Sequence, residues 1–191
     1  GTGRCGTTFL MLIFTFLELD TGFNNSNYED EIFDNCNSGL EKNYNTNHKI
    51  IKNPLFLSQI KDIIDNEAIE YFIIPVRDFD LSSNSRFIIE NKIKKNNNIN
   101  SVPGGYTDPD IESKESQLCT YHEDMVNYLF YMIKYDIPTI FIDFDLMIRE
   151  KYYLYYKLHP IMKKQNINFQ TFTKAYNKAQ KHQNKERNYK L

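Results

Sequence analysis

Cysteine is scarce in this chain. Its three cysteines are Cys5, Cys36 and Cys119, and no two of them have the C-x-x-C spacing. An odd, widely spaced set of this kind supports neither a disulfide framework nor a zinc site. The sequence therefore indicates a reducing compartment, and we expect a cytoplasmic protein unless an upstream segment directs it elsewhere.

Long apolar runs are also missing. The strongly apolar stretch near the start, residues 9–17, spans nine residues, whereas a membrane-spanning helix needs about 20. No small-residue cleavage site follows it, so we do not expect a signal peptide. The sequence thus predicts no membrane segment within these 191 residues.

An excess of charge of either sign is lacking too. The net charge is −2 and the isoelectric point is about 6.1, which argues against a protein that coats nucleic acid. Residues 174–191 are locally basic, with six Lys or Arg and one acid, and we interpret them as a solvated helix or a frayed tail. At 191 residues and 41% hydrophobic composition, we expect residues 1–191 to form a single domain.

The chain begins with a glycine-rich turn, Gly1 to Thr8, that leads directly into the apolar stretch. Glycines allow the backbone to fold around an anion, so that amide N–H groups and the positive end of a helix dipole point at it. The spacing from Gly1 to Gly6 fits the frame G-x-x-x-x-G-K-[ST], but Thr7 stands where that frame has lysine. The turn therefore indicates phosphate binding of a kind that differs from ordinary ATP hydrolysis.

Phosphate-binding loops of this kind normally follow a buried β-strand. Here the sequence begins at Gly1, directly at the loop. We expect a central strand to lie upstream of this sequence, together with any targeting or membrane segment.

The rest of the chain alternates between helical and extended patterns. Two stretches are connections: residues 20–47 are a long polar one with scattered apolar anchors, and residues 95–117 are a polar loop. The apolar spacing predicts helices at 7–19, 55–64, 82–94 (capped by Ser82 or Ser83) and 120–135, and strands at 48–52, 70–76 and 139–143.

Strands that alternate with helices predict an α/β fold, with a parallel β-sheet flanked by helices. Ligands of such sheets bind at the carboxyl ends of the strands. Lys52, Arg77 and Asp143 each come at the end of a predicted strand, and the glycine-rich loop follows the strand expected upstream. We therefore expect these four segments to converge on one edge of the sheet.

Three stretches, in order, resemble the sulfotransferases that use 3′-phosphoadenosine 5′-phosphosulfate (PAPS). The segment Gly3 to Thr8 is similar to the family's 5′-phosphosulfate loop. The segment Val76 to Arg86 is similar to the family's strand end, where an arginine (Arg77) is followed eight residues later by a serine (Ser85). Residues 140–147, followed by residues 153–161, are similar to the strand and then helix near the end of the family's domain.

The resemblance implies a P-loop sulfotransferase-like fold, PAPS as co-substrate and no metal. It implies that Gly3, Arg4, Cys5, Gly6, Thr7 and Thr8 bind the 5′-phosphosulfate, and that Arg77 and Ser85 bind the 3′-phosphate. Arg4 fits a catalytic role on physical grounds as well, because sulfuryl transfer builds charge on the bridging oxygen and a guanidinium holds two oxygens at once.

The acceptor, a hydroxyl or an amine, must lose a proton as it attacks, which requires a positioned base. The candidates are Glu41, Glu31 and His48, and Lys52 is a candidate for contact with the sulfate or the acceptor. His122, His159 and His182 lack metal-ligand spacing and are interpreted as structural. The acceptor itself has no readable code, so sugars, lipid headgroups, peptides and small metabolites all remain open.

Two other functions stay in competition. A nucleotide kinase would use Asp143, at the end of an apolar strand, to bind magnesium, but it would lack the loop lysine. A non-catalytic nucleotide-binding remnant would retain the fold without the activity. Ligand binding separates the three functions. A sulfotransferase should prefer 3′,5′-adenosine bisphosphate without magnesium, a kinase should prefer ATP with magnesium, and a remnant should bind neither.

Overall fold

The structure is a computed structural model of the 191-residue chain. It describes residues 3–33, 38–53, 56, 58–94, 105 and 111–188. Cys36, most of the predicted loop 95–117 and the last three residues of the basic tail lie outside this part of the chain. Within it, the elements are α1 (Thr7–Phe16), the 3-10 helix η1 (Glu29–Glu31), β1 (Ile32–Phe33), β2 (Ser38–Gly39), α2 (Ile60–Asn66), β3 (Phe72–Val76), α3 (Phe79–Lys94), α4 (Lys114–Lys134), β4 (Thr139–Asp143), α5 (Phe144–Arg149), α6 (Lys151–Lys157), α7 (His159–Lys164) and α8 (Phe169–Asn188).

A small parallel sheet lies at the centre of the molecule. β3 pairs with β4 from Phe72 opposite Thr139 to Val76 opposite Asp143. β1 and β2 form a separate antiparallel pair. Because Val76 is level with Asp143, the residues that follow β3 and β4 emerge at the same edge of the sheet, where the sequence places Arg77 and Asp143.

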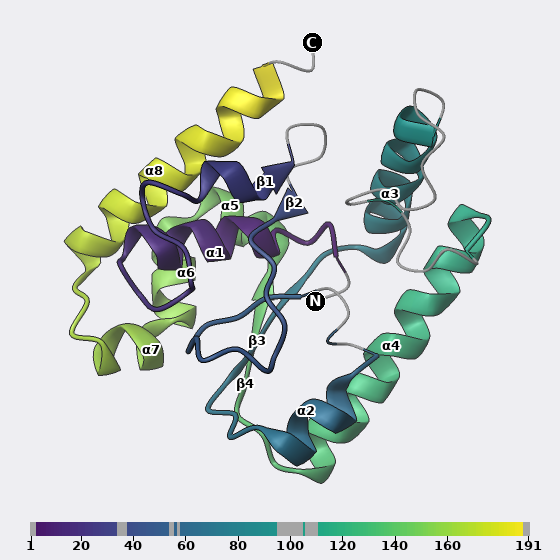
Figure 1. Cartoon of the computed structure of the whole chain (residues 1–191), viewed down its shortest axis with the longest axis horizontal. Helices are drawn as coiled ribbons and strands as arrows, with labels where there is room; N and C mark the ends of the chain where they lie inside the picture. The colour runs from purple at the N-terminus through teal and green to yellow at the C-terminus, as the bar shows by residue number, and fades with distance from the viewer. Residues whose placement is uncertain are drawn as a thin grey trace.

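Helices cover both faces of the β3–β4 sheet (Figure 1). One face carries α1 and α5 to α8, and the other carries α2, α3 and α4. The larger apolar core includes α1, Ile142 of β4, Leu154 of α6 and Phe172 of α8, while Ile74 of β3 packs with Ile60 and Tyr128 in a smaller core. The chain is thus a mixed α/β protein in which helices dominate.

Helix α1 owes its place to its composition. Every residue from Phe9 to Thr15 is buried, as expected for a helix that is apolar nearly all round. Phe9 meets Tyr176 of α8 edge to face at 5.4 Å between ring centroids. This burial fixes the helix in the core, and with it the loop 3–6 that precedes it.

Most of the predicted elements are present, with shifted boundaries. The strands predicted at 70–76 and 139–143 are β3 and β4, and the four predicted helices correspond to α1, α2, α3 and α4. α3 begins at Phe79 because Asp78 caps it, with its carboxylate accepting from the Leu81 N–H at 2.9 Å. Ser82 and Ser83 therefore lie inside the helix, and the prediction that one of them is the cap was wrong.

The prediction of a strand at 48–52 was also wrong, because these residues form no strand in the structure. The backbone of this segment bonds to irregular segments instead: the Ile50 N–H donates to the Asp20 carbonyl, and the Lys52 carbonyl accepts from the Lys42 N–H. The apolar pair at 50–51 resembles a strand, but the tertiary partners for its backbone are loops, so no ladder forms.

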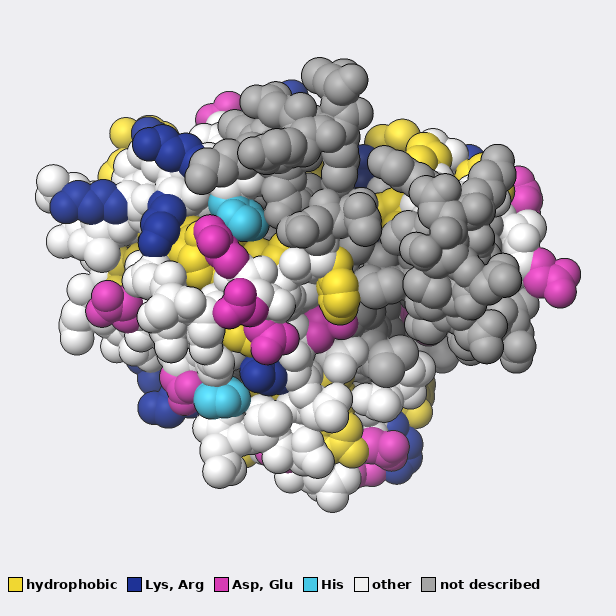
Figure 2. Space-filling model, turned by 45° about the horizontal axis from the view of Figure 1, so that its top comes forward, with side chains coloured by type: hydrophobic (Ala, Val, Ile, Leu, Met, Phe, Trp, Pro, Cys, Tyr) yellow, Lys and Arg dark blue, Asp and Glu magenta, His cyan; other side chains and the backbone are white. Residues whose placement is uncertain are grey.

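The surface carries charges of both signs. Figure 2 shows Lys and Arg side chains interspersed with Asp and Glu over the face that it displays, in keeping with the net charge of −2. Among the residues that the structure describes, no helix is long and apolar enough to cross a membrane.

Candidate functional site

The glycine-rich loop has the left-handed backbone that its sequence requires. Gly3, Arg4 and Gly6 have φ angles of +76°, +56° and +82°, and Gly6 is the N-cap of α1. No side chain in the described part of the chain caps this helix, so the first-turn amides, which have no partner within the helix, remain suited to an anion. The loop therefore has the backbone geometry of an anion-binding turn.

Arg4 joins the loop to α3. Its Nε donates to the Ser85 Oγ at 3.1 Å, although the two residues are 81 positions apart. Arg77, directly after β3, donates from Nη1 to the Arg4 carbonyl at 3.1 Å. The structure thus brings together the loop arginine, the strand-end arginine and the helix serine that sequence reasoning selected.

Lys52 approaches the same loop from another segment. Its Nζ donates to Thr8 Oγ1 at 3.2 Å, to the Gly39 carbonyl at 2.7 Å and to Glu41 Oε1 at 3.1 Å. The Lys52 side chain is 10% exposed. The loop has Thr7 where the phosphate-loop frame has lysine, but the ammonium group of Lys52 lies beside it. This group links Glu41 to Thr8.

Helix α5 packs against the other side of the loop. A Cβ added at Gly6 would lie 3.0 Å from Phe144 Cε2 and would crowd the Met147 methyl, so this close packing, together with the positive φ, requires glycine. The Arg77 guanidinium lies over the Phe144 ring, 4.8 Å from its centroid. Cys5 is fully buried, so its backbone rather than its thiol is placed to contribute to the site.

Sequence reasoning missed Arg86. This side chain is 4% exposed; it donates from Nε to the hydroxyl of the buried Tyr121 and from Nη1 to the Gly105 carbonyl. Burial raises the pKa of Tyr121, and the charge of Arg86 acts in the opposite direction. The signal in the sequence is weak, since Arg86 follows Ser85 in a helix and an arginine there is usually solvated.

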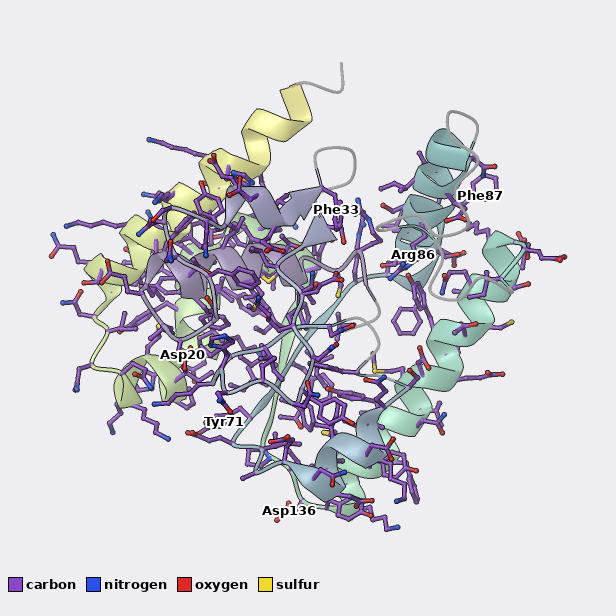
Figure 3. All side chains as sticks on the ribbon, viewed as in Figure 1. Asp20, Phe33, Tyr71, Arg86, Phe87 and Asp136 are labelled. Carbon is purple, nitrogen blue, oxygen red and sulfur yellow. The ribbon has the colours of Figure 1, made fainter. Side chains whose placement is uncertain are left out.

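His48 lies elsewhere. Its Nδ1 is 2.8 Å from Asp20 Oδ1, and this hydrogen bond lowers the pKa of Asp20. Asp20 follows the carboxyl end of α1, a ten-residue helix, which at 1.5 Å per residue puts it roughly 15 Å from the loop. Figure 3 shows Asp20 well apart from Arg86.

Asp143 lies at the expected edge of the sheet, but its carboxylate caps a helix. Oδ1 accepts from the Leu146 N–H at 2.8 Å, and the Asp143 N–H donates to the Tyr153 hydroxyl oxygen at 2.8 Å. Among the described residues, no group of three or more His, Cys, Asp or Glu side chains is arranged to hold a metal ion.

Comparisons with protein-family models, with curated proteins and with solved structures gave no match for this chain.

Proposed function

We propose that this protein is a PAPS-dependent sulfotransferase with a P-loop sulfotransferase-like fold, transferring a sulfuryl group to a hydroxyl or an amine. The observation that carries the proposal is the contact of Arg4 with Ser85 and Arg77. The glycine-rich loop and the segment after β3, which the resemblance assigns to the 5′-phosphosulfate and the 3′-phosphate of one nucleotide, meet beside the N-terminus of α1. A donor with a 5′-phosphosulfate and a 3′-phosphate has anions at both ends of its ribose, which matches a site with several fixed cations.

In this proposal the loop holds the phosphosulfate. The amides of residues 5–8, the Arg4 guanidinium and the Thr8 hydroxyl donate to its oxygens, and Lys52 adds a charge that is already held beside Thr8. Arg77 and Ser85 bind the 3′-phosphate. Fixed donors of this kind stabilise the charge that develops as the bond to the leaving group breaks.

The transfer itself is a direct displacement. The acceptor oxygen or nitrogen attacks sulfur while the bond from sulfur to the bridging phosphate oxygen breaks, and that bond's electron pair leaves with 3′,5′-adenosine bisphosphate. The acceptor proton passes to Glu41, the candidate base that Lys52 connects to the loop. Glu41 is favoured over His48 because His48 pairs with Asp20 beyond the far end of α1.

The test is calorimetric titration of 3′,5′-adenosine bisphosphate into the protein without magnesium. We expect binding that Arg4→Ala abolishes and that Arg149→Ala, a control on the exposed Arg149 of α5, leaves intact. Magnesium-dependent ATP binding in place of bisphosphate binding would support the nucleotide kinase instead. Binding of neither ligand by the folded protein would support the non-catalytic remnant.

A further inference from the structure

Arg86 lies where three separate segments meet. Its guanidinium contacts Tyr121 of α4 and the carbonyl of Gly105, and it fills the space beside Gly3, since a Cβ added there would overlap it. Figure 3 shows Arg86 on the side of α3 that faces the body of the molecule, and Phe87 on the outer side. The side chain is therefore built into the support of the loop rather than directed to solvent.

Burial of this charge has a structural requirement. A guanidinium taken out of water is stable only where its donors find acceptors in a fixed arrangement. The Tyr121 oxygen, in a residue that is fully buried, and the Gly105 carbonyl supply two such acceptors. Because guanidinium is planar, these contacts also fix the edge of the group that lies against Gly3.

The loop residues next to Arg86 are the ones that need support. Gly3 and Arg4 have consecutive positive φ angles, and a left-handed conformation is unfavourable for a residue with a side chain such as Arg4. Two neighbours on α3 hold this pair: Ser85 accepts from the Arg4 side chain, and Arg86 packs on Gly3. Adjacent residues of the helix thus match adjacent residues of the loop.

We propose that Arg86 is a positioning residue for the phosphate loop: held by Tyr121, it fixes Gly3 so that the loop amides are set for the anion before the anion binds. The consequence for ligand affinity rests on the proposed donor site. Preorganised donors bind more tightly because less ordering occurs on binding. Arg86 need not touch the nucleotide for this effect.

The first test replaces the planar guanidinium of Arg86 by an ammonium group, which keeps the positive charge. Arg86→Lys should weaken binding of 3′,5′-adenosine bisphosphate about 10-fold to 100-fold, the range expected when charged hydrogen bonds are lost. In turnover assays it should raise the KM for PAPS and leave the KM for the acceptor unchanged. The matched control is Arg149→Lys on the surface of α5, which should bind like the wild type.

The hydroxyl of Tyr121 gives a milder variant. Tyr121→Phe removes one acceptor from Arg86 and should weaken bisphosphate binding in the same direction. Tyr128→Phe is the control, because Tyr128 is also buried on α4 but packs in the smaller core with Ile60 and Ile74. Equal affinities for the two variants would count against the inference.

The space between Gly3 and Arg86 gives a double-mutant cycle. Gly3→Ala should weaken binding more in the wild-type background than in Arg86→Ala, because the added methyl meets the guanidinium only when Arg86 is present. The strain of the positive φ is common to both backgrounds. Independent effects, in which the two fold-changes multiply, would overturn the inference.

Hydrogen–deuterium exchange of the loop amides separates this inference from the proposed function, since it needs no ligand. Exchange at residues 3–8 should be faster in Arg86→Lys than in the wild type and unchanged in Arg149→Lys. If Arg86→Lys leaves loop exchange unchanged, the positioning role is wrong whatever the nucleotide does. If loop protection depends on Arg86 and the wild type still binds no 3′,5′-adenosine bisphosphate, the positioning role stands and the proposed function fails.

Discussion

Replacing Arg77 by alanine removes two interactions at once. The Arg77 guanidinium donates to the Arg4 carbonyl at 3.1 Å and lies 4.8 Å from the centroid of the Phe144 ring. In the proposed donor complex it also faces the 3′-phosphate. Arg77→Ala should therefore weaken nucleotide binding more than it lowers the rate of transfer at saturation.

The size of the effect follows from the charged hydrogen bond to the 3′-phosphate in the proposed complex, since the contacts with Arg4 and Phe144 are present in the free protein and act on affinity only by holding Arg77 in place. A hydrogen bond with a charged partner contributes about 1.5–3 kcal/mol. This corresponds to a loss of about 10-fold to 140-fold in affinity, since 1.4 kcal/mol is tenfold. Arg77→Lys should lie between alanine and the wild type, because lysine keeps the charge and loses the fork.

The assay is calorimetric titration of 3′,5′-adenosine bisphosphate into the wild type, Arg77→Ala and Arg77→Lys. Phe144→Leu serves as the partial control, since it removes the ring beneath Arg77 and leaves the hydrogen bond to Arg4. Its loss of affinity should be at most about twofold to fivefold, which corresponds to the full contribution of about 0.5–1 kcal/mol from a cation over an aromatic ring. Wild-type affinity in Arg77→Ala would refute the reasoning, because Arg77 would then make no contact with the 3′-phosphate.

Three further predictions concern other parts of the molecule. Lys52→Met removes the ammonium beside Thr8 and should lower kcat for sulfuryl transfer by about 100-fold with little change in nucleotide affinity; a kcat within about threefold of the wild type would contradict this. The pKa of Asp20 lies below its ordinary value of 3.8, so the hydrogen bond to His48 contributes stability that is present above about pH 4 and is lost as the pH falls through the folded pKa. NMR titration should show that the pKa of the Asp20 carboxyl rises in His48→Ala. An unchanged pKa would count against the pairing of His48 with Asp20. Leu154→Ala, in the fully buried core, should lower the free energy of unfolding in urea by about 2–5 kcal/mol, and a change below about 1 kcal/mol would contradict the position of α6.

The candidate site could be predicted from sequence only where residues are close along the chain. Gly3, Gly6 and Arg4 are recognisable because a tight turn before an apolar helix needs glycines and an anion site needs a charge. The pairing of Arg4 with Ser85 is a contact across 81 positions, and spacing from Arg77 gave only an indirect indication of it. Arg86 carried only a weak signal, because a helical arginine is buried only when partners such as Tyr121 lie against it.

The distance of each candidate base from the glycine-rich loop was likewise decided by the tertiary structure. Glu41 and His48 were both candidates in the sequence, Glu41 within the long polar connection and His48 at the start of the strand predicted after it. Lys52 ties Glu41 to Thr8, whereas His48 pairs with Asp20 beyond the carboxyl end of α1. The neighbouring sequence does not distinguish Glu41 from His48, because the difference lies in which distant residue each one contacts.

The sequence by itself determined the local pieces of this protein: a glycine-rich turn, a helix apolar nearly all round, and two short apolar strands, one followed by Arg77 and the other ending at Asp143. These follow from backbone preference and apolar periodicity, which act over a few residues. Only the tertiary structure decided that Ser85 and Arg86 meet the loop, that Lys52 lies at Thr8 and that residues 48–52 form no strand. Such contacts depend on packing between segments that are distant in the chain, and packing is a property of the whole fold rather than of any one segment.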